Sequence, residues 1–260
     1  PYFNANPKKY ISALVSEDCW QATPGKVVDL VRNLGIAAGG TVMEDCRVLE
    51  ACREGKYTSV LVQTHDKKYV EYRTEHFVNA LGSGAGKLCD SMGIDAGLYP
   101  VRHQAFITRR LPMLGKHGTN LDMLIDRQDY KGFSAVYGQQ IAYTGQIIGC
   151  ASPKLDAMRI DKNLKVNTKA FLEIVSEMFS EWIPDLAGVG IQAVWAGYYT
   201  EPRYIVDPEL GLFVGMRGHG FMLSQYIARM YVDKLLGRPV PEYFEKLKLN
   251  GPGLSEKAFK

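Results

Sequence analysis

A short apolar segment at residues 212–214 runs directly into a glycine-rich turn at residues 215–220 and then into a helical pattern at 222–236. A strand followed by glycines and a helix brings backbone N–H groups and the positive end of the helix to one point. Such a turn suits an anionic or electron-rich ligand group, although the same pattern also serves a simple chain reversal. This unit is the strongest local constraint on the fold.

The first hundred residues combine helical and strand patterns. Apolar residues recur at helical spacing from residue 27 to 38, where Gly39 and Gly40 follow. Residues 56–63 and 68–73 alternate apolar and polar side chains around His65-Asp66, which predicts a β-hairpin. A short apolar strand is expected at 77–81, leading into glycines and a short helix.

After Pro100 the pattern changes to that of an antiparallel sheet with one amphipathic helix. The helix is expected at 167–182, with Phe171, Ile174, Val175, Met178, Phe179 and Trp182 on one face. The strands are expected near 104–108, 121–125, 133–137, 141–148 and 189–199. The predicted fold class is therefore α+β, with an α/β part and an antiparallel-sheet part.

Composition excludes several classes of protein. The 31 basic and 28 acidic residues are scattered, so no nucleic-acid footprint is visible. Five cysteines form no CxxC pair, which favours reduced thiols in a cytoplasmic protein. No apolar run approaches the length of a membrane span, so we expect no transmembrane segment; a peripheral membrane location is left open.

Motif searches for common cofactor and metal sites fail. Residues 82–87 lack the Walker spacing and miss the GxGxxG fingerprint by one residue. The five histidines never fall at metal-ligand spacing, so no metal site is predicted. No GxSxG elbow occurs either, which argues against a hydrolase of that type.

Three segments carry a resemblance to a known family. Residues 190–200, 202–207 and 211–224, above all the GxxGHGF turn that begins at Gly215, resemble the end of the D-amino-acid-oxidase-like flavoproteins. Residues 78–82 resemble the "VNAxG" strand of that family, and 100–104 resemble its "PxRxQ" crossing into the substrate domain. This family includes sarcosine oxidases, glycine oxidases and dye-linked L-proline dehydrogenases.

The resemblance implies an FAD-dependent oxidation of a C–N bond, in which a hydride passes to the flavin N5. The substrate would be an amino acid or a secondary amine similar to proline or sarcosine. A 2-hydroxy acid or primary amino acid remains an alternative, as does a non-catalytic subunit that retains only the fold. The cofactor-binding residues implied by the family motifs are Val48, Ala80, Gly82, Gly215, Gly218, His219, Gly220, Phe221 and Met222.

Departures from the family pattern sharpen these expectations. Trp195 matches a cysteine that holds FAD covalently in some sarcosine oxidases, so we expect non-covalent FAD. The oxygen-activating lysine of those oxidases falls at about Ile147, which favours a dehydrogenase with an artificial or quinone-type electron acceptor. Met222 matches their carboxylate-binding lysine. Catalytic residues therefore stay unknown, and the candidates on the substrate side are Tyr143, Arg203, Arg217 and Met222, each of which can equally be structural.

The family's ADP-binding segment has no counterpart in the sequence. It would occupy about 150 residues with GxGxxG and an acidic ribose ligand. The resemblance thus leads us to expect that the chain is a fragment, or that a separate subunit supplies this half. The expected division is an FAD-binding domain in two pieces, 1–99 and 201–260, around a substrate domain at 100–200.

Overall fold

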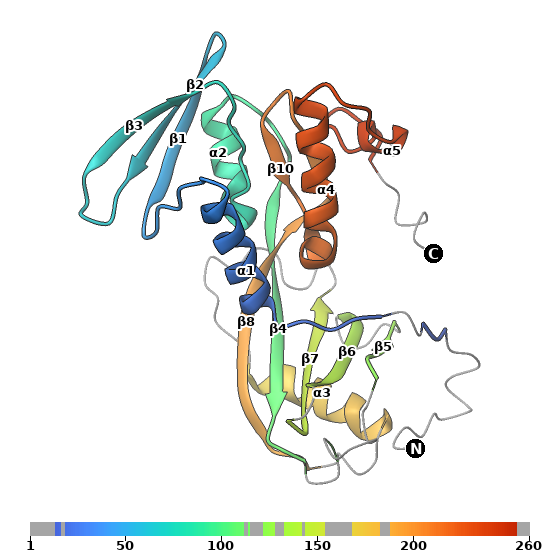
Figure 1. Cartoon of the computed structure of the whole chain (residues 1–260). Coiled ribbons are helices and arrows are strands. Elements are labelled where there is room, and N and C mark those ends of the chain that lie inside the picture. Colours follow the sequence, from blue (N-terminus) through green and yellow to red (C-terminus); the bar gives the residue numbers. More distant parts are fainter. Residues whose placement is uncertain are drawn as a thin grey trace. The chain divides into compact units, whose positions relative to one another are not determined.

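A computed structural model describes residues 14–16, 19–111, 114, 122–127, 133–141, 144–153, 168–182 and 188–253. The chain divides into two compact units, one formed by Val101–Tyr199 with the first residues up to Val15, the other by Ser16–Pro100 with Thr200–Lys260. Strands β4 (Tyr99–Thr108) and β8 (Ile191–Glu201) each cross from one unit to the other (Figure 1). The domain roles expected for residues 1–99, 100–200 and 201–260 stay predictions.

The first unit contains a five-stranded sheet with the strand order β5-β6-β7-β4-β8, which we call the large sheet. Its other strands are β5 (Leu124–Asp126), β6 (Phe133–Ile141) and β7 (Gln146–Pro153). The pairs β5–β6, β6–β7 and β7–β4 are antiparallel, which confirms the α+β class with an antiparallel sheet.

One expected strand in this sheet is wrong. Residues 141–148 do not form a continuous strand, because Ile141 ends β6 and Gln146 begins β7. Gly145 lies in the turn between them with a φ of 68°, a left-handed conformation that glycine adopts without strain. Thr144, Gly145 and Gln146 interrupt the apolar residues at this turn, and the predicted strand wrongly ran through them.

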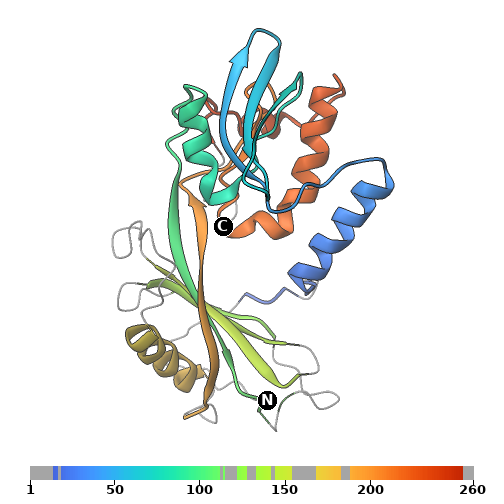
Figure 2. The same cartoon turned by 90° about the vertical axis from the view of Figure 1, so that its left-hand side faces the viewer.

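Helix α3 (Thr168–Trp182) packs on one face of the large sheet (Figure 2). Two strand glycines make room for aromatic rings at this contact. A Cβ atom on Gly138 would lie 2.3 Å from Cζ of Phe179, and one on Gly149 would lie 2.5 Å from the Phe106 ring. The expected apolar face of the helix is confirmed at its described side chains, since Phe171, Ile174, Val175, Met178 and Phe179 are all buried.

The second unit begins with α1 (Pro24–Ala37) and an antiparallel sheet of β1 (Arg47–Glu54), β2 (Tyr57–Gln63) and β3 (Tyr69–Thr74). The predicted hairpin at residues 56–73 is confirmed by the β2–β3 pair. Helix α2 (Ala85–Ser91) lies against this sheet. Its Leu88 joins Ala51, Val60 and Val62 in one buried cluster.

The remainder of this unit is the strand–turn–helix that the sequence predicted. Strands β9 (Ile205–Asp207) and β10 (Leu212–Val214) form a hairpin, followed by the 3₁₀ turn Arg217–His219 and by α4 (Gly220–Leu235). The strand expected at 77–81 is reduced to a single parallel bridge between Asn79 and Leu212. Within the described residues, only the β10 side offers this segment a partner, which explains the short pairing.

The chain ends in a short helix, α5 (Glu242–Glu245), and an extended segment that packs back onto β9. Phe244 and Leu247 are almost fully buried, and the Val206 amide donates to the Leu247 carbonyl at 2.9 Å. No described helix is long and apolar enough to cross a membrane.

Candidate functional site

The turn after β10 can be built only with glycine at its first position. Gly215 has a φ of 72°, and a Cβ atom there would lie 1.9 Å from the Arg203 carbonyl oxygen. A side chain would therefore meet both backbone strain and a hard clash. The glycine lets the chain leave β10 and turn directly toward α4.

An ion pair fixes the middle of this turn. Arg217 has a φ of 50°, a conformation uncommon for a residue with a side chain. Its Nε donates to Oε2 of Glu201 at 2.6 Å, and the Glu201 side chain is only 8% exposed. A buried carboxylate needs such a partner, so Arg217 is bound into the frame of the turn.

The exposed side of the turn presents the start of α4. No side chain caps this helix end, where His219 is the N-cap residue. Nδ1 of His219 lies 2.5 Å from the Tyr204 hydroxyl, which fixes the imidazole. Gly218 and His219 are exposed, as are Phe221 and Met222, at 46% and 68%. The uncapped end of a 16-residue helix favours an electron-rich group.

A second glycine turn lies at the same edge of the unit. Because the bridge between Asn79 and Leu212 is parallel, the segments that follow both residues leave toward the same side. The buried Asn79 side chain supports this turn by donating from Nδ2 to the Ala85 carbonyl at 3.0 Å. Ala80 is exposed, and Gly82 has a φ of 55° with nothing within 4 Å of where a Cβ would stand. The structure therefore brings the Ala80–Gly82 and Gly215–Met222 candidates to one edge.

Val48 lies on a different element, the small sheet. Val48 is in β1, where it pairs with Val62 of β2, and it packs against the buried cluster that contains Leu88. The ladder is interrupted between Val48 and Glu50, so a β-bulge lies beside Val48. A bulge leaves backbone groups outside the ladder, which is compatible with the resemblance, since the family places a backbone contact to the adenine of FAD at Arg47-Val48. That contact stays a prediction.

The arginine candidates are both engaged within the unit. Arg203 donates from Nη1 to the Gly251 carbonyl at 3.2 Å, and from Nη2 to the Leu249 carbonyl. Arg217 is held by Glu201 as described above. Tyr143 lies outside the described residues. The substrate-side roles of Arg203, Arg217 and Met222 stay predictions.

Sequence reasoning missed a polar cluster on the face of the large sheet opposite α3. The rings of His103 and Tyr199 stack with centroids 3.8 Å apart, and the hydroxyls of Tyr199 and Tyr137 lie 3.4 Å apart. Burial raises the pKa of the Cys150 thiol to about 11 and raises the pKa of Tyr137 well above its usual value. Both groups are therefore neutral at physiological pH. Strand alternation in the sequence could have revealed this cluster, because it places these side chains on the face of the sheet opposite to that of Phe106 and Ile147.

Ile147, the expected match of the oxidase lysine, lies on the α3 side of the large sheet. Ile147 is fully buried and belongs to the cluster against α3, so its side chain points away from the polar face. Its neighbours Gln146 and Ile148 alternate to the opposite face. The role expected for this position stays a prediction.

Comparison with known proteins identifies the family to which the chain belongs. The model of the DAO family, described as FAD dependent oxidoreductase, matches residues 2–234. The chain belongs to this family. A search of curated proteins finds no match. Among the described residues, no group of three or more His, Cys, Asp or Glu side chains is placed to hold a metal ion.

Solved structures of DAO-family type resemble the fold. L-proline dehydrogenase from P. horikoshii has a TM-score of 0.67 at 24% identity, covering 87% of this chain and 59% of its own. Iminodiacetate oxidase from Chelativorans sp. BNC1 gives 0.64 at 15% identity, covering 88% and 58%. Glycine oxidase from Geobacillus kaustophilus gives 0.63 at 18%, covering 83% and 54%. The chain thus spans less than two thirds of the length of each of these relatives.

Proposed function

We propose that this chain takes part in the FAD-dependent oxidation of a C–N bond in an amino acid or secondary amine. The observation that carries the proposal is the edge where two glycine turns meet beside the uncapped N-terminus of α4, in a chain of the FAD dependent oxidoreductase family. When bound, FAD supplies the acceptor for the hydride that leaves the carbon next to the nitrogen. A second segment with the ADP-binding fingerprint would complete the cofactor site, since the chain spans 59% of the length of L-proline dehydrogenase.

The residues of this edge fit a non-covalently held flavin. The open space at Gly82 leaves room for a flat group close to the backbone. The first turn of α4 supplies N–H groups and a positive dipole end, which stabilise negative charge on a neighbouring ring system. Glu201, Arg217 and Tyr204 would act as positioning residues, because they hold the turn and His219 in place.

The polar face of the large sheet is our candidate for the substrate side. Tyr137 and Tyr199 offer hydroxyl groups, and burial raises the pKa of Tyr137. Such groups donate to a substrate carboxylate or accept from an ammonium. Stacking of His103 on Tyr199 fixes the ring, so its hydroxyl has a defined direction.

We favour a dehydrogenase over an oxidase. The oxygen-activating lysine of related oxidases matches the apolar Ile147 in the family resemblance. A cation beside the flavin stabilises developing superoxide and an apolar side chain does not, so this substitution disfavours rapid reaction with oxygen. The electron acceptor would be quinone-type, or an artificial dye in the assay.

The test is anaerobic titration of the purified protein with L-proline, sarcosine, glycine and lactate. We expect a flavin absorption spectrum that L-proline or sarcosine bleaches, with slow peroxide formation in air. A protein that lacks flavin even when the segment with the ADP-binding fingerprint is present would support the non-catalytic alternative, bleaching by lactate alone would support a hydroxy-acid substrate, and rapid peroxide formation would identify an oxidase.

A matched pair of variants tests the substrate side. Tyr199→Phe removes only a hydroxyl, and we expect KM for the amine to rise about tenfold or more because a hydrogen bond to a charged group is lost. Tyr72→Phe makes the same change on an exposed β3 side chain and should leave KM unchanged. Equal KM values for both variants would remove Tyr199 from the substrate site.

A further inference from the structure

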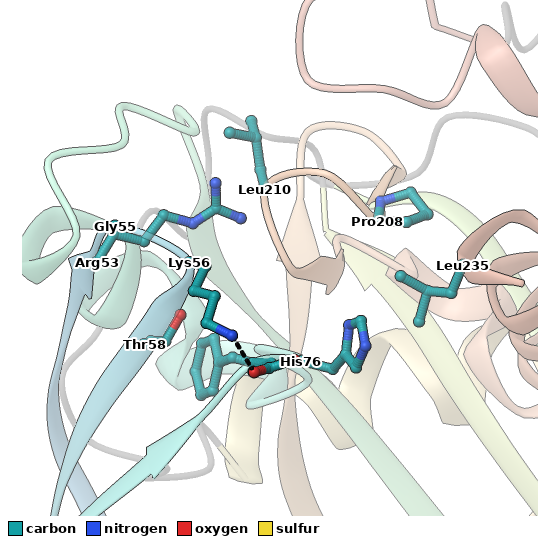
Figure 3. Close-up of a pocket in the computed structure, with 10 residues that line it drawn as sticks. Arg53, Gly55, Lys56, Thr58, His76, Pro208, Leu210 and Leu235 are labelled. Carbon is teal, nitrogen blue, oxygen red and sulfur yellow. Dashed lines mark hydrogen bonds and ion pairs between the residues drawn. The ribbon is translucent and has the colours of Figure 1, made fainter.

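A cavity of about 160 Å³ lies in the second unit (Figure 3). It is bounded by the β1–β2 turn, the segment after β3, the β9–β10 loop and the end of α4. We propose that this cavity binds a small carboxylate with a short apolar body. Its lining includes the polar side chains of Arg53, Lys56, Thr58 and His76 and the apolar side chains of Leu210 and Leu235.

Hydrogen-bond donors with unused capacity face this cavity. Arg53 donates from Nη2 to the Glu209 carbonyl, which holds its guanidinium in place and leaves its other N–H groups without a partner among the described residues. The His76 ring and the Thr58 hydroxyl likewise have no hydrogen-bond partner in the described part of the chain, although Thr58 is only 4% exposed. Figure 3 shows Arg53 and His76 on either side of the cavity. Unused donors around one space call for an acceptor.

The charge of the lining favours an anionic acceptor. Lys56 Nζ lies 2.8 Å from Glu75 Oε1, and this contact lowers the pKa of Glu75, so that pair is charged on both sides. Arg53 then leaves the lining with net positive charge. The nearby carboxylate of Asp207 is occupied, because it accepts from the amides of Glu209, Leu210 and Leu249.

Size and apolar walls narrow the chemical class. A volume of 160 Å³ corresponds to about five water molecules. That is room for a carboxylate with three or four carbons, and too little for a nucleotide. Phe77, Pro208, Leu210 and Leu235 supply apolar surface beside the donors, where the alkyl group of a small carboxylate can lie.

This site is separate from the proposed flavin edge. The cavity borders the loop before β10, whereas Gly215 follows the other end of that strand. Binding here can therefore be present or absent whatever the outcome of the flavin experiment.

The test follows the NMR signals of the His76 ring in purified protein labelled with ¹³C-histidine. The chain has five histidines, so few signals need to be resolved. The probe is isobutyrate, exchanged for chloride at constant ionic strength, and the neutral control is isobutyramide. We expect a saturable shift of the His76 signal with isobutyrate and none with isobutyramide. The spectrum of His76→Asn assigns the signal.

Variants then test the donors. Arg53→Gln should weaken isobutyrate binding at least about tenfold, since a charge-assisted hydrogen bond is lost. Arg229→Gln removes the same charge from an exposed site on α4 and should leave binding unchanged. Thr58→Val keeps the side-chain shape and removes the hydroxyl that lines the cavity. It should weaken isobutyrate binding several-fold, and it tests the proposal even if Arg53→Gln fails to fold.

The proposal is overturned by any of three results. These are no saturable shift with isobutyrate, an equal shift with isobutyramide, or unchanged affinity in folded Arg53→Gln and Thr58→Val proteins. Because His76 reports locally, a carboxylate bound at the substrate face alone would give no saturable shift and would count against the proposal.

Discussion

Helices α3 and α1 have similar apolar stripes in sequence but opposite surroundings in the structure. In α3 the stripe is buried against the large sheet, and Phe171 is fully inaccessible. In α1 no residue is buried, and Val28 and Leu34 are 62% and 61% exposed. Periodicity therefore predicts that a segment is helical and which face is apolar, whereas the partner of that face is a property of tertiary structure.

Removing an aromatic ring from the α3 contact should have the largest effect. Phe171→Ala leaves a cavity among Phe106, Phe133 and the rest of this cluster, so we expect the free energy of unfolding to fall by about 3–5 kcal/mol. Urea denaturation measures this change. Glu173→Ala, an exposed site on the same helix, is the control and should change little. A loss below about 1 kcal/mol in Phe171→Ala would mean that α3 is loosely packed.

Adding a methyl group to a glycine tests the same difference in packing between α3 and α1. Gly138→Ala places a Cβ 2.3 Å from the Phe179 ring, and we expect a loss of about 1–3 kcal/mol from overpacking. Gly35→Ala in α1 meets nothing within 4 Å and should stabilise by up to about 1 kcal/mol through helix propensity. Thermal denaturation of both variants should therefore give shifts of opposite sign. Shifts of the same sign would contradict the difference in packing.

The smallest effect is expected on the α1 stripe itself. Leu34→Ala should change the free energy of unfolding by no more than about 0.5 kcal/mol, because the side chain is mostly exposed. Chemical denaturation of residues 1–260 gives this value. A loss above about 1 kcal/mol would show that the stripe is covered in solution and would end the contrast with α3.

Local patterns predicted most elements because each has a short-range cause. The β2–β3 hairpin follows from alternation, and α4 follows from the glycine turn and helical spacing. The strand at 141–148 was wrong because the prediction ran through Thr144 and Gly145, where the chain turns between β6 and β7. The segment at 77–81 kept only one bridge, since pairing depends on a neighbour that local sequence does not reveal.

The glycine turn was predictable as a ligand candidate, but the groups that hold it were not. Glu201 and Arg217 are sixteen positions apart, and only the β9–β10 hairpin brings them to 2.6 Å. The stack of His103 on Tyr199 joins residues from β4 and β8, so no local pattern contains it. Engagement of Arg203 by the Leu249 and Gly251 carbonyls also depends on the path of the last residues.

That path matters for anyone who shortens the chain. The family match ends at residue 234, yet Leu247 is 2% exposed and bonded to β9, and Arg203 is anchored to residues beyond it. A chain that ended where the family match ends would keep every residue of the glycine turn. It would lose the residues that pack on β9 and hold Arg203. A shortened protein that keeps the turn in its native conformation should therefore extend at least through Gly251, whose carbonyl accepts from Arg203.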